Sequence, residues 1–163
     1  MAEGVFTKAL ELMSQGNIDF TGALDTFKIA LLRANGTATF TLDATTADIN
    51  SAATILTTYE YASTNYPAGG TTPGSILTSR DDTKNKVIMT SALVDFTNLA
   101  AATSGSAIIT GALLYISSST QGNADVSVAY YNLPNVTPNG TTLSVGPITG
   151  GGLVAFKSSV STD

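Results

Sequence analysis

The chain has 163 residues, of which 43% are hydrophobic and only 12% are charged, with a formal net charge of −5 and neither Cys nor His. A chain of this length can bury a core without metal or disulfide support, so we expect one domain over residues 1–163 and no cofactor. The lack of Cys excludes disulfides, thiolate catalysis and zinc–thiolate sites. The seven basic residues are scattered along the chain, which argues against nucleic-acid binding.

The N-terminal residues 1–16 are predicted to form a helical segment. One stripe of a helical wheel collects its apolar side chains, which are Val5, Phe6, Ala9, Leu10, Leu12 and Met13. Gly16 supplies the left-handed residue with which helices commonly end. We interpret this helix as a lid over its own domain, with an arm toward a neighbouring subunit as the alternative. The chain has no apolar run long enough to span a membrane and no secretory signal, so we expect a soluble protein made in a cytoplasm.

A β-hairpin is predicted to follow over residues 27–42. Apolar residues alternate along 27–33 and along 38–42, and Asn35-Gly36 lies between the two runs. Asn-Gly suits a two-residue type I′ turn, which would place Leu31 opposite Phe40.

Further strands are expected along the rest of the chain. Thr45 or Thr46 caps a predicted helical turn over 47–53, and a long surface loop over 62–79 is expected to carry a short edge strand. Residues 107–116 are almost continuously apolar, which predicts a central strand buried on both faces, with a bulge or bend at Gly111. Turns or loops are predicted at 80–85, 117–123 and 134–140, and strands at 54–61, 86–96, 125–133, 141–145 and 153–158. The pattern indicates an all-β fold, a mainly antiparallel sandwich or jelly roll of about eight strands with one short N-terminal helix.

Carboxylates and tyrosines are the remaining candidates for chemistry. Without His or Cys an enzyme is restricted chiefly to paired-carboxylate catalysis, and the adjacent Asp81 and Asp82 lie in a charged turn, so we expect no enzyme. Five aspartates could in principle bind calcium but lack calcium-loop spacing: Asp43, Asp48, Asp81, Asp82 and Asp125. Six tyrosines offer a stacking platform for sugars or, in the preferred interpretation, core and interface packing: Tyr59, Tyr61, Tyr66, Tyr115, Tyr130 and Tyr131.

Four segments, in this order, resemble a family of small structural proteins of tailed bacteriophages. The first is FTKALELMSQGNIDFTGALDTFKIALL at 6–32, in which a short helix and a Gly turn precede a strand that begins Asp-Thr. The others are the Tyr-Pro-Ala-Gly-Gly loop at 66–70, the apolar strand at 107–116 and the ending VTPNGTTLSVGPITGGGLVAFK at 136–157.

The resemblance implies a non-enzymatic virion protein, most simply a head decoration or cement protein on the capsid surface. Such a protein would be made in the host cytoplasm, form a symmetric homo-oligomer, a dimer or trimer, and bridge subunits of the major capsid protein. The alternative is a tail- or fibre-associated structural module, or one that binds host glycans. The candidate contact residues are Phe6, Leu10, Met13, Tyr66, Pro67, Gly69, Gly70, Thr72, Asp81, Asp82 and Lys84.

Overall fold

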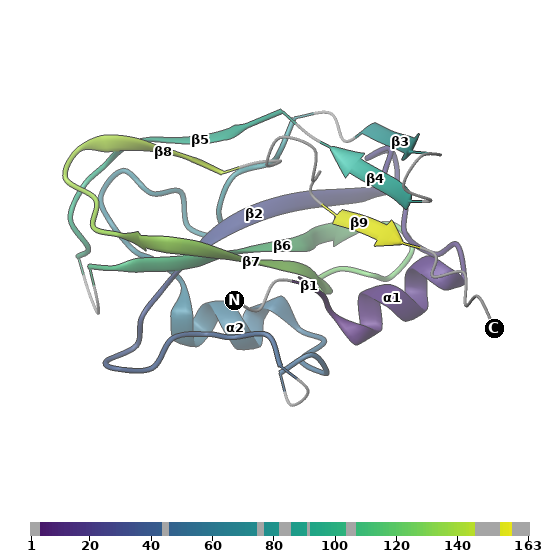
Figure 1. The fold of residues 1–163 in the computed structure, drawn as a ribbon, viewed down its shortest axis with the longest axis horizontal. Coiled ribbons are helices and arrows are strands. Elements are labelled where there is room, and N and C mark those ends of the chain that lie inside the picture. Colours follow the sequence, from purple (N-terminus) through teal and green to yellow (C-terminus); the bar gives the residue numbers. More distant parts are fainter. Residues whose placement is uncertain are drawn as a thin grey trace.

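The computed structural model describes residues 4–43, 46–74, 77–81, 86–90, 92–103, 107–145 and 154–157. Within these ranges the fold is mainly antiparallel β with two short helices, α1 (Thr7–Ser14) and α2 (Ala52–Tyr59) (Figure 1). The strands are β1 (Gly4–Val5), β2 (Asp25–Arg33), β3 (Leu77–Asp81), β4 (Lys86–Thr90), β5 (Val94–Leu99), β6 (Ile109–Ser119), β7 (Ser127–Val136), β8 (Thr141–Val145) and β9 (Val154–Lys157).

The strands pair into a four-stranded sheet of order β1-β7-β6-β2, a three-stranded sheet of order β3-β4-β9 and a two-stranded ribbon of β5 and β8. Every pair of neighbouring strands is antiparallel. The β5–β8 ribbon lies on one side of the four-stranded sheet and α2 lies on the other (Figure 1). The central layer is therefore covered on both faces.

Strand β6 lies between β7 and β2, as its apolar sequence predicts. Its first eight residues, 109–116, are all buried, because each face of the sheet packs against another layer. The pairing of β6 with β7 shifts between Ile109 and Gly111, which confirms the predicted irregularity. A Cβ atom on Gly111 would lie 2.5 Å from the ring of Tyr130, so the missing side chain makes room for that ring.

The predicted hairpin of 27–33 with 38–42 is wrong. Strand β2 pairs with β6, placing Leu31 opposite Ala112, and the turn is closed by a single bridge between Asn35 and Ala38. Gly36, with a φ of 63°, and Thr37 are the two turn residues, so Gly occupies the first central position, as in a type II′ turn. The chain then crosses the face of the sheet, where Phe40 is 3% exposed and packs in a hydrophobic cluster with Ala30, Leu32 and Leu113, so burial of its ring favours this path.

The predicted strand at 54–61 is also wrong, because these residues contribute most of helix α2. Ala52 and Ile55, three residues apart, are buried, whereas Ala53, Thr54 and Thr57 are exposed. The apolar face of a helix packs on the sheet here and overrides the strand propensity of the Thr and Tyr residues. The predicted helical turn at 47–53 is confirmed only in part. Residues 46–48 form a turn in which the N–H of Ala47 donates to the carbonyl of Asp43 at 2.8 Å, but 49 and 50 are not helical and α2 begins at Ala52.

Other boundaries shift less. The predicted strand 86–96 is divided into β4 and the start of β5, and β7 continues through Pro134, which was expected to lie in a loop. Beyond Tyr130, β7 has a partner only on its β6 side in the described pairing, so Pro134 can sit in the strand without breaking a second ladder. Strand β8 has the predicted bounds, and β9 lies inside its predicted range.

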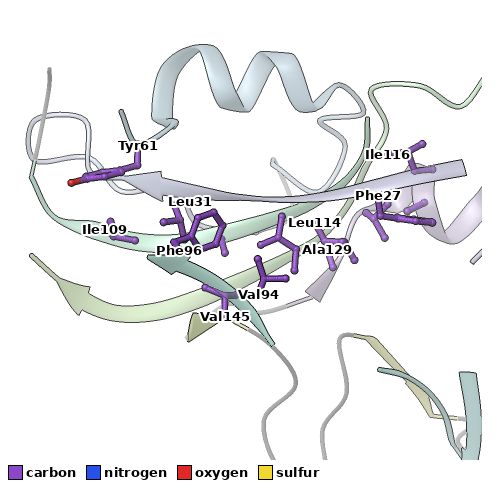
Figure 2. Close-up of a cluster of buried hydrophobic side chains, with 14 of the residues drawn as sticks. Phe27, Leu31, Tyr61, Val94, Phe96, Ile109, Leu114, Ile116, Ala129 and Val145 are labelled. Carbon is purple, nitrogen blue, oxygen red and sulfur yellow. The ribbon is translucent and has the colours of Figure 1, made fainter. Parts of the chain in front are cut away.

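Two hydrophobic clusters lie on opposite faces of the four-stranded sheet. The first core joins the sheet to the β5–β8 ribbon, as Figure 2 shows for Leu31, Phe96 and Val145. The second core joins the opposite face to α2 and the segment around Phe40, and it contains Phe6, Ala30, Leu32, Phe40, Ala52, Ile55, Leu113, Tyr115 and Tyr130. Among the described residues, neither helix is long and apolar enough to cross a lipid bilayer.

Candidate functional site

A loop at residues 66–74, here called the edge loop, lies along the outer edge of β2. The backbone N–H of Ile29 donates to the carbonyl of Thr71, and the N–H of Thr71 donates back to the carbonyl of Ile29, both at 2.9 Å. Just before the loop, the N–H of Tyr61 donates to the carbonyl of Leu31 at 2.9 Å. These bonds occupy backbone groups that an exposed sheet edge would leave open to other chains.

Tyr66 anchors the edge loop in the first core. Its hydroxyl oxygen accepts a hydrogen bond from the backbone N–H of Leu31 at 3.1 Å. Its ring centroid lies 5.8 Å from that of Tyr61, edge to face, and 5.8 Å from that of Phe96, stacked. Burial, reinforced by the nearby carboxylate of Glu60, raises the pKa of Tyr66, so the phenol stays protonated even at an alkaline pH at which an exposed Tyr ionises.

The two glycines of the loop are required by its close approach to the sheet. A Cβ atom on Gly70 would lie 2.0 Å from the carbonyl oxygen of Ile29, and the φ of Gly70 is 78°. The carbonyl of Gly69 accepts a hydrogen bond from the Tyr115 hydroxyl at 2.7 Å, and its N–H donates to the Glu60 carboxylate. The sequence Tyr-Pro-Ala-Gly-Gly at 66–70 therefore holds the edge loop against the sheet.

The prediction that this segment is a surface loop throughout is wrong, because part of it is buried. Tyr66 is 8% exposed and Gly70 is buried, while Pro67 and Thr72 are exposed and Gly69 is partly exposed. Tyr66 and Gly70 face inward because they hold the loop on β2. The exposed residues of the edge loop are Pro67, Ala68, Thr72 and Gly74, and the first three are here called its crest.

Two hollows flank this crest. The larger has a volume of about 390 Å³ and lies between the edge loop and α2, with Arg33, Glu60 and Ala68 in its wall. The smaller has a volume of about 200 Å³, with Thr72 and Phe20 in its wall. Exposed residues beside two hollows form a surface that can be complementary to loops of another protein.

Helix α1 contacts β7 and packs on its own chain, as the interpretation of the helix as a lid predicts. Phe6 is fully buried in the second core, and Ala9 and Leu12 are buried in the first. Met13 is partly buried, and Leu10 is 43% exposed although the helical wheel places it on the apolar stripe. The prediction that Val5 and Phe6 belong to the helix is wrong, because Val5 lies in β1 and Phe6 precedes α1 in an extended conformation. The accessible apolar residue of the helix is Leu10.

The predicted turn at 80–85 is wrong at its start, because Arg80 and Asp81 belong to β3. Asp81 ends β3 and pairs with Lys86 of β4. The other two candidate contacts in this turn, Asp82 and Lys84, lie outside the described residues.

The structure bears on the two alternative site types from the sequence, a sugar platform of tyrosines and a calcium site of aspartates. Four of the six tyrosines, Tyr61, Tyr66, Tyr115 and Tyr130, are at most 8% exposed, which confirms core packing for them and argues against a sugar platform. Among the described residues, no group of three or more carboxylates is placed to hold a metal ion.

Asp125 instead caps α2. Its Oδ1 accepts from the N–H of Ala53 at 2.8 Å, its backbone carbonyl accepts from the N–H of Ala52 at 2.8 Å, and its Oδ2 accepts from the Ser51 hydroxyl. A carboxylate at a helix N-terminus satisfies orphan backbone donors and interacts favourably with the helix dipole. The cap is a long-range contact that a local sequence pattern does not reveal.

Comparison of the chain with protein-family models, with curated protein sequences and with solved structures gave no match.

Proposed function

We propose that this protein is a non-enzymatic structural protein of a tailed-bacteriophage virion, and that it decorates the capsid and bridges subunits of the major capsid protein. The observation that carries the proposal is the ordered set of four segments that resembles small phage structural proteins. The geometry adds that three of these segments meet: the edge loop docks on β2 through Tyr66 and Gly70, and Tyr115 of β6 donates to Gly69. The shared motifs thus belong to one packed framework.

A mechanical role suits the surface of this chain. Only 12% of its residues are charged, so broad contacts with another protein desolvate few charges. The edge loop occupies the outer edge of β2, and its crest and the exposed Leu10 are accessible as contact groups. We propose Pro67, Thr72 and Leu10 as contacts with the capsid, on a protein that assembles as a symmetric dimer or trimer.

We further propose that the sheets form a β sandwich of the jelly-roll type. The β5–β8 ribbon supports this architecture, because its inward residues Val94, Phe96 and Val145 share the first core with the four-stranded sheet. An experimental structure in which β3, β4 and β9 do not extend either layer would contradict the jelly-roll assignment.

The proposal is tested on particles of the phage that encodes the chain. Heads and tails are separated and analysed by mass spectrometry, then heads stripped of the protein are compared with reconstituted heads for heat tolerance. We expect the protein in the head fraction, and we expect its return to restore heat tolerance. Its presence only in tails, or unchanged tolerance of stripped heads, would contradict the decoration role.

Variants of the crest locate the contact surface. Ala68→Arg places a long charged side chain on the crest, and we expect it to weaken head binding by about tenfold or more, as loss of one good interface contact does. Gln121→Arg is the matched control, because Gln121 is also exposed but lies in the turn between β6 and β7. Equal head binding by both variants would exclude the crest as the contact surface.

A further inference from the structure

We propose that Asn35-Gly36 is a site of spontaneous deamidation and isoaspartate formation, and that the folded protein protects the second Asn-Gly pair, Asn139-Gly140. Both pairs are followed by Thr and both are exposed. Local sequence alone therefore predicts similar reactivity. The two sites differ in the hydrogen bonding of the attacking nitrogen.

The reaction requires only water. The backbone nitrogen of the glycine attacks the side-chain carbonyl carbon of the asparagine, a C–N bond forms, and the amide nitrogen leaves as ammonia to give a five-membered succinimide. Water then opens the ring at either carbonyl and yields aspartate or isoaspartate. Glycine at the second position favours this reaction because it has no side chain to obstruct the approach.

The first site is open to this attack. Among the described residues, no hydrogen bond is made by the Gly36 N–H or by the Asn35 side chain. The turn is closed by one isolated bridge, in which Asn35 N–H donates to Ala38 at 2.7 Å and Ala38 N–H donates to Asn35 at 3.0 Å. Because no ladder continues the bridge, a small local opening frees the turn for ring closure.

The second pair, Asn139-Gly140, is constrained by hydrogen bonding to β5. The N–H of Gly140 donates to the carbonyl of Leu99 at 2.7 Å, so the attacking nitrogen is engaged. The next residue, Thr141, pairs with Leu99 at the start of the β5–β8 ribbon. Ring closure there must break this hydrogen bond and disturb the end of a sheet.

Reaction at Asn35 has a structural consequence. Isoaspartate lengthens the main chain by one atom and adds a negative charge in the turn that leads to Phe40. Phe40 is 3% exposed in the second core, and its carbonyl accepts the Tyr130 hydroxyl at 2.9 Å. Modification is expected to loosen this segment of the second core.

To test this, the purified folded protein is incubated at mildly alkaline pH. Conversion of Asn35-Gly36 and Asn139-Gly140 is followed by peptide mapping with mass spectrometry, and isoaspartate is detected with an isoaspartyl methyltransferase. We expect conversion at Asn35 to be about tenfold faster than at Asn139, the effect of one extra hydrogen bond at the upper end of its usual range. In urea, where neither turn is folded, the two rates should be alike.

Two variants complete the test. Asn35→Gln should abolish most of the isoaspartate signal of the folded protein, whereas Asn139→Gln should leave it nearly unchanged. Equal conversion of both pairs in the folded state, faster conversion at Asn139, or a difference that persists in urea would overturn the proposal.

Discussion

At the scale of single residues, Gly70 and Asp125 hold together parts of the chain that are distant in sequence. Gly70 allows the edge loop to touch β2, and Asp125 caps a helix that begins 73 positions earlier in the chain, at Ala52. Asp125 also has a φ of 69°, a left-handed conformation that Asp and Asn tolerate better than most residues. Each position therefore combines a backbone requirement with a tertiary contact.

Gly70→Ala is predicted to destabilise the protein by about 3 kcal/mol or more, because the left-handed φ and the collision with Ile29 both oppose the new methyl group. Gly16→Ala is the control, since Gly16 has a φ of 70° but a methyl group there would meet no atom within 4 Å. Gly16→Ala should lower the free energy of unfolding by only about 1 kcal/mol. Urea unfolding monitored by circular dichroism measures both, and equal losses would mean that the edge loop does not press on β2.

Asp125→Ala is predicted to cost about 2 kcal/mol, because it removes the α2 cap and places Ala in a left-handed conformation. Asp125→Asn should cost less than half as much, since the amide oxygen can still accept the Ala53 N–H and Asn tolerates this φ. Thermal unfolding compares the two variants. If Asn is as harmful as Ala, the cap hydrogen bond does not contribute in the way proposed.

At the scale of elements, α2 illustrates how packing overrides local preference. Thr, Ile and Tyr favour strands, yet Ala52 and Ile55 face the second core from one side of a helix. The same surface receives Phe40, whose ring lies 5.6 Å from that of Tyr59. Both the failed hairpin and the failed strand thus have one cause, the need to cover the second face of the sheet.

Ile55→Ala is predicted to destabilise the protein by about 3 kcal/mol, because Ile55 is 1% exposed and its loss leaves a cavity. Thr54→Ala, one position away on the exposed face, should change stability by less than about 0.5 kcal/mol or raise it slightly, as Ala favours helices. Chemical denaturation separates these outcomes. Comparable losses at both positions would contradict the helix orientation.

At the scale of the whole molecule, the buried phenols link stability to pH. Burial raises the pKa values of Tyr61, Tyr66 and Tyr115, and the Glu60 carboxylate adds to the effect for the last two. An unfolded Tyr loses its proton at about pH 10, whereas these folded residues keep theirs. The unfolded state therefore binds fewer protons above that pH, and stability decreases as pH rises.

We predict that the contribution of the buried phenols to stability is fully present below about pH 10 and is lost above it, with cooperative unfolding. Ultraviolet absorbance of tyrosinate and far-ultraviolet circular dichroism are followed together during an alkaline titration. A portion of the tyrosinate signal should appear only as the circular dichroism signal is lost. Complete ionisation of all tyrosines while the fold is intact would contradict the burial of these rings.

The sequence by itself determined the elements whose patterns are local and strong. The helix that ends just before Gly16, the buried central strand β6 with its irregularity at Gly111, and β8 all follow from hydrophobic periodicity and glycine placement. The start of the helix does not, because Val5 belongs to β1 and the helix begins at Thr7. The turn at Gly36 is also local, although the hairpin expected to extend from it does not form. These elements are predictable because the pattern that marks each of them lies within a few neighbouring residues.

Only the tertiary structure decided which edge and which face each segment covers. Tyr66 and Gly70 lie in a segment whose composition is typical of a surface loop. They are buried because they contact β2, about 35 to 40 positions away in the sequence. The helical state of 52–59 likewise depends on a sheet face that is assembled from distant strands. The free energy of burying apolar surface is shared among segments that meet only in the folded chain, so it overrides preferences that each segment shows alone.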